Sequence, residues 1–193
     1  MEDYLTRYKE HLKNNYRVSE NEWNILKELL KVVPVAKNDY YVKQGKVCRS
    51  IGYLAEGVMR YCTFREDGED LTCYFMHEND FVGDPKSLET QQPSELNAQA
   101  LTDCILITIS LEDIQQLIKK IPRAIEVHTS INYDVTKGLT DQKTFMLGRD
   151  AASRYREFMK RYPDILQRIP LNYVAAFLGI TQQSLSRLRK QIS

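Results

Sequence analysis

The chain has 193 residues and a mass of 22.6 kDa, with 42% hydrophobic residues, 27% charged residues and a formal net charge of +1. This balance is typical of soluble globular proteins and excludes wholesale disorder and a fibrous repeat. No apolar run approaches the ~20 residues that span a bilayer, and no apolar stretch typical of a signal peptide follows the charged N-terminus. We therefore expect a cytoplasmic protein with no membrane partner.

The charge is divided unevenly along the chain. Residues 1–148 contain 18 Lys and Arg against 23 Asp and Glu, a net charge of −5, whereas residues 149–193 contain 9 against 3, a net charge of +6. A concentrated basic segment is typical of a protein that binds phosphates. The alternative is a solvated helix surface, and charge alone does not separate the two.

Cysteines and histidines form no pattern that indicates a metal site. No two of the four cysteines make a CxxC pair, and the three histidines are scattered. We therefore expect reduced thiols, no metal and no cofactor. An enzyme would need a nucleophile–base pair or a carboxylate pair, and neither is visible, because His77 is more typical of a turn. The sequence predicts no catalytic residues and no enzyme.

The first thirty residues predict two helices. Tyr8 and Leu12 belong to an apolar series at helical spacing. Ser19, followed three residues later by Glu22, has the form of a capping box that begins the second helix, and Pro34 is expected to close that helix.

From about Val35 to Ile109 the pattern changes to short β-prone runs separated by turn residues. Runs at roughly 8–12-residue spacing are typical of an all-β sandwich or barrel. Asp67-Gly68 between two of these runs is a hairpin signal. The middle of the chain is therefore predicted to be a β domain.

Helical periodicity then returns, with a short helix from Leu111 to near Pro122 and a long one over 123–147. A helix of about 25 residues spans roughly 37 Å, and its narrow apolar stripe is typical of a coiled-coil seam. We favour homodimerisation along this stripe. The alternative is packing onto the β domain, and both can hold for different faces. The stripe comprises Ala124, His128, Ile131, Val135 and Leu139.

The basic segment predicts a helix that Asp150 caps, followed by two short helices joined by a tight turn. Pro170 suits the start of the first short helix, Gly179 its end, and Thr181 the N-cap of the second. This arrangement is a helix-turn-helix, with a plain αα-hairpin as the alternative.

Amide, hydroxyl and guanidinium groups lie on the outer face of the last predicted helix. These groups read base edges and phosphates in a major groove, and the segment from Gln182 onward has three cations and no acid. The glutamines are expected to face base edges, and the cations to contact phosphates or guanine. The predicted DNA-binding residues are Asn172, Thr181, Gln182, Gln183, Ser184, Ser186, Arg187, Arg189 and Lys190.

The order of these parts resembles the Crp/Fnr family of bacterial transcription regulators. The resemblance covers nearly the whole chain and includes turn glycines Gly45 and Gly57, the run over 79–84 and the tail over 171–192. It implies an α+β fold with an N-terminal double-stranded β-helix (jelly roll) of cyclic-nucleotide-binding type. The implied parts are a sensor domain over 1–120, a long dimerisation helix over 121–148 and a small all-α helix-turn-helix domain over 149–193. It also implies a homodimer that reads a palindromic operator in double-stranded DNA and works with RNA polymerase.

One departure from the family concerns the effector pocket. Members that bind cyclic AMP have a Gly-Glu pair followed about ten residues later by an Arg-Ser pair. Here Gly83-Asp84 replaces the first pair, Ser94 falls near the Arg position, and Lys86 is the only nearby cation. A cyclic phosphate needs a cation or many donors, so we expect cyclic AMP to bind weakly or not at all. The pocket is expected to take another small molecule or none.

The other departures concern the C-terminal part. The segment 161–169 leaves little room for flanking strands, which predicts a DNA-binding module without a wing. Gln183 stands where the family commonly reads a base with Glu, so a different operator is expected. The sequence supports neither the iron–sulfur nor the haem variant of the family. Gly148 is a candidate hinge between the long helix and the helix-turn-helix segment, or a simple helix-end glycine.

A second function remains open: a small-molecule-binding module that regulates a protein partner without binding DNA. It predicts no DNA affinity and no salt dependence of binding, and the basic segment counts against it.

Overall fold

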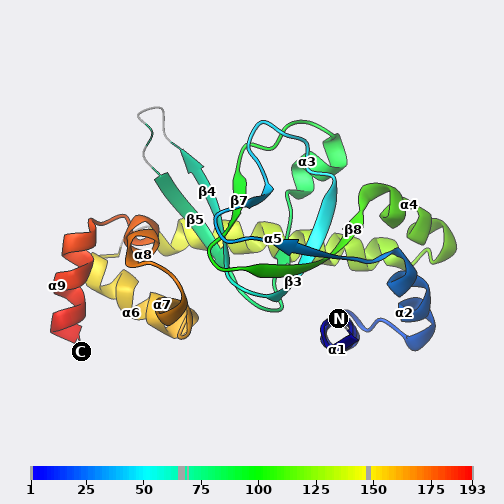
Figure 1. Cartoon of the computed structure of the whole chain (residues 1–193), viewed down its shortest axis with the longest axis horizontal. Coiled ribbons are helices and arrows are strands. Elements are labelled where there is room, and N and C mark those ends of the chain that lie inside the picture. The colour runs from blue at the N-terminus through cyan, green and yellow to red at the C-terminus, as the bar shows by residue number, and fades with distance from the viewer. Residues whose placement is uncertain (1, 65–67, 69, 147–148, 193) are drawn as a thin grey trace.

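The computed structural model describes residues 2–64, 68, 70–146 and 149–192 (Figure 1). Its strands are β1 (Lys31–Val35), β2 (Tyr40–Val42), β3 (Ser50–Glu56), β4 (Met59–Phe64), β5 (Asp70–Met76), β6 (Phe81–Val82), β7 (Asn97–Ala100) and β8 (Cys104–Ser110). Its helices are α1 (Glu2–Tyr16), α2 (Glu20–Leu26), the short 3-10 helix η1 (Lys27–Leu29), α3 (Pro85–Thr90), α4 (Leu111–Lys120), α5 (Ala124–Met146), α6 (Ala151–Arg161), α7 (Ile165–Arg168), α8 (Leu171–Leu178) and α9 (Gln182–Ile192).

The strands form two antiparallel four-stranded sheets, in the orders β1-β8-β3-β6 and β2-β7-β4-β5. This jelly roll, with helices before and after it, confirms the predicted α+β fold class. Strands β4 and β5 pair as the predicted hairpin, with Phe64 opposite Asp70. Gly68 has φ +85°, as a tight turn requires, whereas Asp67 lies outside the described residues.

The core lies between the two sheets and continues into the helices around them. Leu54, Met59, Met76 and Leu106 are completely buried, and burying each such side chain contributes about 1.5–3 kcal/mol. On one side this core extends to α1, whose Tyr8 stacks on Tyr53 of β3 with ring centroids 4.4 Å apart. The N-terminal helices therefore share one core with the β-roll.

The capping box predicted at Ser19 is present. The backbone N–H of Ser19 donates to Glu22 Oε2 at 2.7 Å, and the Glu22 N–H donates to Ser19 Oγ. The helix ends earlier than predicted, and Pro34 lies inside β1 instead of closing the helix. Strand β1 is at the edge of its sheet, where a residue that donates no backbone hydrogen bond is tolerated.

The long helix α5 covers 23 residues, close to the predicted range. It runs lengthwise beside the β-roll, with α1, α2 and α4 near one end and α6–α9, hereafter the C-terminal unit, near the other (Figure 1). Gly148, the candidate hinge, lies outside the described residues. In the described part of the chain, no helix is long and apolar enough to cross a membrane.

Candidate nucleic-acid interface

Helices α8 and α9 form the helix-turn-helix that the sequence predicts. Gly179 follows α8 with φ +65° and ψ 37°, and its N–H donates to the carbonyl of Ala176 at 3.2 Å. Glycine takes this left-handed conformation without a Cβ penalty, which ends the helix and turns the chain. Thr181 caps α9, because its Oγ1 accepts the backbone N–H of Ser184 at 3.1 Å.

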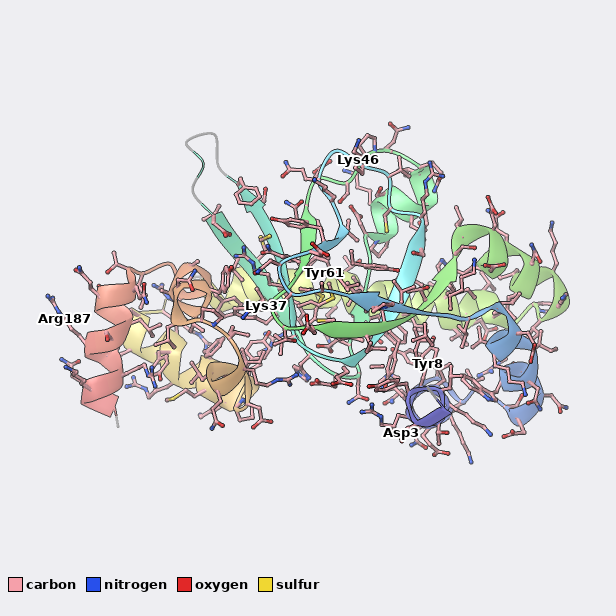
Figure 2. All side chains as sticks on the ribbon, viewed as in Figure 1. Asp3, Tyr8, Lys37, Lys46, Tyr61 and Arg187 are labelled. Carbon is pink, nitrogen blue, oxygen red and sulfur yellow. The ribbon has the colours of Figure 1, made fainter. Side chains whose placement is uncertain are left out.

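Helix α9 buries one side against α8 and exposes the other. Leu185 is completely buried with Val174 and Leu178 of α8. The predicted DNA-binding residues are all exposed, and Arg187 points away from the rest of the molecule (Figure 2). Helix α9 contains no acidic residue, so its outer surface is basic. DNA contact requires this exposure, and the individual contacts stay a prediction.

Four aromatic side chains, hereafter the aromatic cluster, join the C-terminal unit to the β-roll. Phe75 of β5 is completely buried, and its ring centroid lies 5.0 Å from Phe177, 5.9 Å from Phe158 and 6.0 Å from Tyr162. Because side chains alternate along a strand, Phe75 faces these helices while neighbouring Met76 faces the roll interior. The cluster therefore gives the helix-turn-helix a defined orientation on the roll.

A bidentate ion pair lies beside the aromatic cluster. Arg168 of α7 donates from Nη1 to Glu78 Oε2 at 2.8 Å and from Nη2 to Oε1 at 2.6 Å. The Gly57 N–H donates to the same carboxylate at 2.8 Å. Burial acts to raise the pKa of Glu78, but these hydrogen bonds and the Arg168 charge outweigh it and lower that pKa to about 2. The carboxylate is therefore held ionised where the C-terminal unit meets the roll.

We expect this ion pair to make the stability of the chain sensitive to acid. The folded pKa of Glu78 lies below its ordinary 4.5, so its contribution is complete above about pH 4.5 and is lost as the pH falls toward 2. The two side chains are 32% and 27% exposed, so screening limits the contribution to about 1 kcal/mol. Urea unfolding across this pH range measures it. Glu78→Gln should flatten the acid limb, and an equally steep loss in that variant would contradict the assignment.

Arg60 of β4 connects the same sheet to α8. It is 1% exposed, and its guanidinium donates to both carboxylate oxygens of Asp70 at 2.7 and 2.6 Å and to Gln99 Oε1. Its Cζ lies 4.1 Å from the ring centroid of Tyr173, a cation–π distance. The helix-turn-helix thus rests on a buried charge whose hydrogen bonds are made within the roll.

The predicted effector residues at the start of α3 are engaged by the protein itself. Asp84 caps α3, because its Oδ1 accepts the Ser87 N–H at 3.1 Å. The Tyr61 hydroxyl donates to the Gly83 carbonyl at 2.6 Å and accepts the Gly83 N–H at 3.0 Å. Tyr61 is almost completely buried inside the roll (Figure 2), so it occupies space next to these backbone groups.

The other two predicted effector residues lie farther along the same segment. Lys86 pairs with Glu95 at 2.7 Å on the surface. Ser94 is 3% exposed, and its hydroxyl donates to the Leu96 carbonyl at 2.9 Å. The side chains of Asp84, Lys86 and Ser94 are thus each engaged by a different group of the protein, and the structure does not bring them together on one shared partner.

The apolar stripe predicted as a dimer seam faces the roll. Ile131 and Val135 are each 7% exposed within the roll core, and Ala124 and Leu139 pack against it. His128 lies beside Asn132 of the same helix. This placement corrects the expected face, because the core of the same chain already covers these side chains. The alternative left open by the sequence, packing onto the β domain, describes this stripe.

In the described part of the chain, no group of three or more His, Cys, Asp or Glu side chains is placed to hold a metal ion. The four cysteines, all within the described residues, form no disulfide.

Residues 32–121 match the model of the cyclic nucleotide-binding domain family. This segment, which is less than half of the chain, is therefore similar in sequence to that family's domain. It comprises β1 to β8, α3 and α4, whereas the helix-turn-helix lies outside it. No curated protein sequence matches the chain significantly.

The fold of the whole chain is that of Crp/Fnr regulators. It is similar to CLP, the c-di-GMP-responsive global regulator of Xanthomonas campestris, with TM-score 0.72, 16% identity and coverage of 90% of this chain and 91% of CLP. It is similar to FixK2 of Bradyrhizobium japonicum, with TM-score 0.71, 14% identity and 84% coverage of each chain. A Crp/Fnr family transcriptional regulator of Eubacterium rectale gives TM-score 0.70, 16% identity and coverage of 93% and 85%. The predicted resemblance is confirmed in fold.

Proposed function

We propose that the protein is a DNA-binding transcription regulator of Crp/Fnr type. The observation that carries the proposal is the outer face of α9, an exposed surface of amides, hydroxyls and cations on a helix-turn-helix. The relatives in fold include CLP and the Eubacterium rectale protein, which are regulators, and the +6 charge of residues 149–193 suits a polyanionic partner. A cytoplasmic location, action through RNA polymerase and the absence of catalytic activity belong to the same proposal.

The active form is a homodimer that uses the outer face of α5. Ile125 and Tyr133 are 53% and 64% exposed, and Thr129 lies between them at four-residue steps on the same exposed face. Exposed apolar side chains of this size on a long helix suit a partner helix. Two recognition helices about 34 Å apart would then meet successive major grooves of a palindromic operator.

We expect Arg187→Ala to weaken operator binding by at least about tenfold while the fold is kept. Arg187 points into solvent, so its loss removes a phosphate or guanine contact worth about 1–3 kcal/mol without disturbing the core. Gel shifts on duplexes selected from a random library by the unaltered chain measure this loss.

Lys46→Ala is the matched control, because it removes one exposed positive charge from the roll, far from α9 (Figure 2). It should leave the affinity within about twofold and keep the slope of affinity against salt. Equal effects of both variants would contradict the assignment of the α9 face. If the unaltered chain selects no duplex, the alternative of a regulator that contacts only a protein partner is favoured.

The effector pocket is degenerate, and we expect no saturable binding of cyclic AMP. Ser94 falls near the Arg position of cyclic-AMP-binding members, Asp84 is committed to the α3 cap, and Lys86 is paired at the surface. Without a free cation, a buried cyclic phosphate stays uncompensated. Calorimetric titration at millimolar nucleotide tests this, and saturable heat that Ser94→Ala abolishes would refute it.

A further inference from the structure

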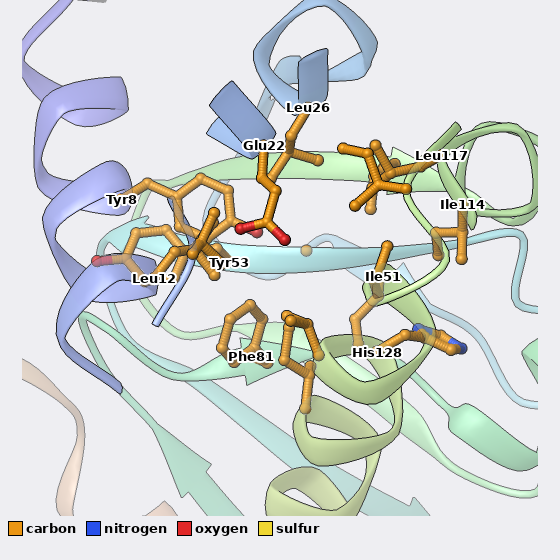
Figure 3. Close-up of a pocket in the computed structure, with 17 residues that line it drawn as sticks. Tyr8, Leu12, Glu22, Leu26, Ile51, Tyr53, Phe81, Ile114, Leu117 and His128 are labelled. Carbon is orange, nitrogen blue, oxygen red and sulfur yellow. The ribbon is translucent and has the colours of Figure 1, made fainter. Parts of the chain in front are cut away.

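An apolar cavity lies between the N-terminal helices and the long helix α5. It has a volume of about 70 Å³ and is walled by side chains from α1, α2, β3, β6, β8, α4 and α5 (Figure 3). Aliphatic and aromatic side chains make up most of the wall, among them Leu12, Ile51, Phe81, Ile114 and Leu117. None of the predicted effector residues at α3 lines it, so this cavity is distinct from the cyclic-nucleotide pocket.

Glu22, the carboxylate in the cavity wall, already has hydrogen-bond partners for both oxygens. Glu22 accepts the Ser19 N–H at 2.7 Å and the Ser19 hydroxyl at 2.8 Å, and Arg123 donates to its other oxygen at 3.2 Å. A second charged group in this cavity would lack a counter-ion and would lose its hydration. The occupant is therefore uncharged.

Tyr8 supplies the polar group that has no partner. It is 5% exposed, and its ring reaches from α1 so that the hydroxyl points into the cavity (Figure 3). Within the described part of the chain this hydroxyl makes no hydrogen bond, whereas the hydroxyl of stacked Tyr53 donates to Asn79. Burial raises the pKa of Tyr8, so the phenol stays neutral. A buried hydroxyl without a partner costs free energy that a ligand oxygen would recover.

We propose that this cavity binds a small, uncharged, mostly apolar molecule with one hydrogen-bonding oxygen, such as a short-chain ketone or alcohol, and that this oxygen meets the Tyr8 hydroxyl. The volume is about half that of an engineered apolar cavity of about 150 Å³ that binds benzene, which sets the size at a few carbon atoms. The ligand would tie α1 and α2 to the first turns of α5. The inference that this ligand acts as an effector rests on the proposed DNA-binding function. The inference that the cavity binds the ligand does not.

The experiment titrates the full chain with ethanol and with propane, a pair of matched size that fits a cavity about half as large as one that binds benzene. Trp23 is the single tryptophan, and its ring lies edge-on to Tyr8 at 6.0 Å, so its fluorescence reports on the cavity. Tyr8→Phe removes the hydroxyl and keeps the ring. It should weaken ethanol binding roughly two- to tenfold and leave propane binding unchanged.

Two variants of α5 locate the site. Ala124 lines the cavity, so Ala124→Leu should fill it and abolish saturation by both compounds. Ser130 of the same helix is exposed and lies outside the cavity wall, so Ser130→Leu should bind as the unaltered chain does. Unchanged ethanol binding in Tyr8→Phe or in Ala124→Leu, or no saturation in the unaltered chain, would overturn the proposal. No DNA is present, so a failure here is distinct from a failure of operator binding.

Discussion

Phe75→Ala should lower the free energy of unfolding by about 3–5 kcal/mol, one of the two largest effects that we expect from a single substitution. Phe75 is completely buried and contacts three aromatic rings of the C-terminal unit. Its removal leaves a cavity bounded by α6, α8 and the outer face of β5, and packed rings cannot fully collapse into it. Urea unfolding measures the loss.

Phe64→Ala is the matched control, because Phe64 lies on the same hairpin but is 45% exposed. That variant should change the free energy of unfolding by no more than about 0.5 kcal/mol. Amide hydrogen exchange separates loss of the whole fold from release of the C-terminal unit, since release would raise exchange in α8 while β3 and β8 stay protected. If Phe75→Ala costs no more than Phe64→Ala, the aromatic cluster does not hold the two parts together.

Local signals in the sequence predicted most of the helix ends correctly. Ser19, Asp150 and Thr181 all cap helices through hydrogen bonds to the backbone N–H three residues later, as their side-chain chemistry predicts. Gly179 turns the chain between α8 and α9. These signals depend on neighbours in the sequence, so tertiary packing does not override them. Pro34 is the exception, because an edge strand accepts proline as readily as a helix end does.

The contacts between the roll and the C-terminal unit could not be predicted from the sequence. In the sequence, Phe75 is one apolar residue among several in a predicted strand. Glu78 and Arg168 are 90 positions apart, so no local pattern connects them. Only the fold determines which face of β5 meets α8. The single local hint is that Phe75 and Met76 are both apolar, which breaks the alternation of a strand with one solvent face and indicates burial on both sides.

The long helix illustrates the same limit. Its apolar period correctly predicts a helix with one covered face, but the period does not identify what covers it. Ile131 and Val135 pack in the core of their own chain, while Ile125 and Tyr133 are left on the outside. A partner helix and a β-roll produce equally apolar stripes, so the choice between them depends on tertiary structure.

Gly57→Ala should destabilise the fold by about 3–5 kcal/mol, the second of the two largest effects. Gly57 has φ +108°, a conformation that costs an alanine about 1–2 kcal/mol. An added Cβ would also lie 2.5 Å from Cys104 Sγ and 2.7 Å from the Asp103 carbonyl oxygen. A backbone oxygen cannot rotate away, so β3 or the 103–104 segment must move, which adds about 1–3 kcal/mol of overpacking.

Gly45→Ala separates these two contributions. Gly45 also has a positive φ, +78°, but no atom lies within 4 Å of an added Cβ, so only the backbone cost of about 1–2 kcal/mol applies. Urea unfolding gives the loss in free energy of unfolding for both variants, and the difference between the two losses measures the cost of the Cβ clash at Gly57. Equal losses would contradict the clash. The Gly57 N–H also donates to Glu78, so its displacement should weaken the pair with Arg168. Gly57→Ala should consequently flatten the acid limb of stability, as Glu78→Gln does, whereas Gly45→Ala should leave it unchanged.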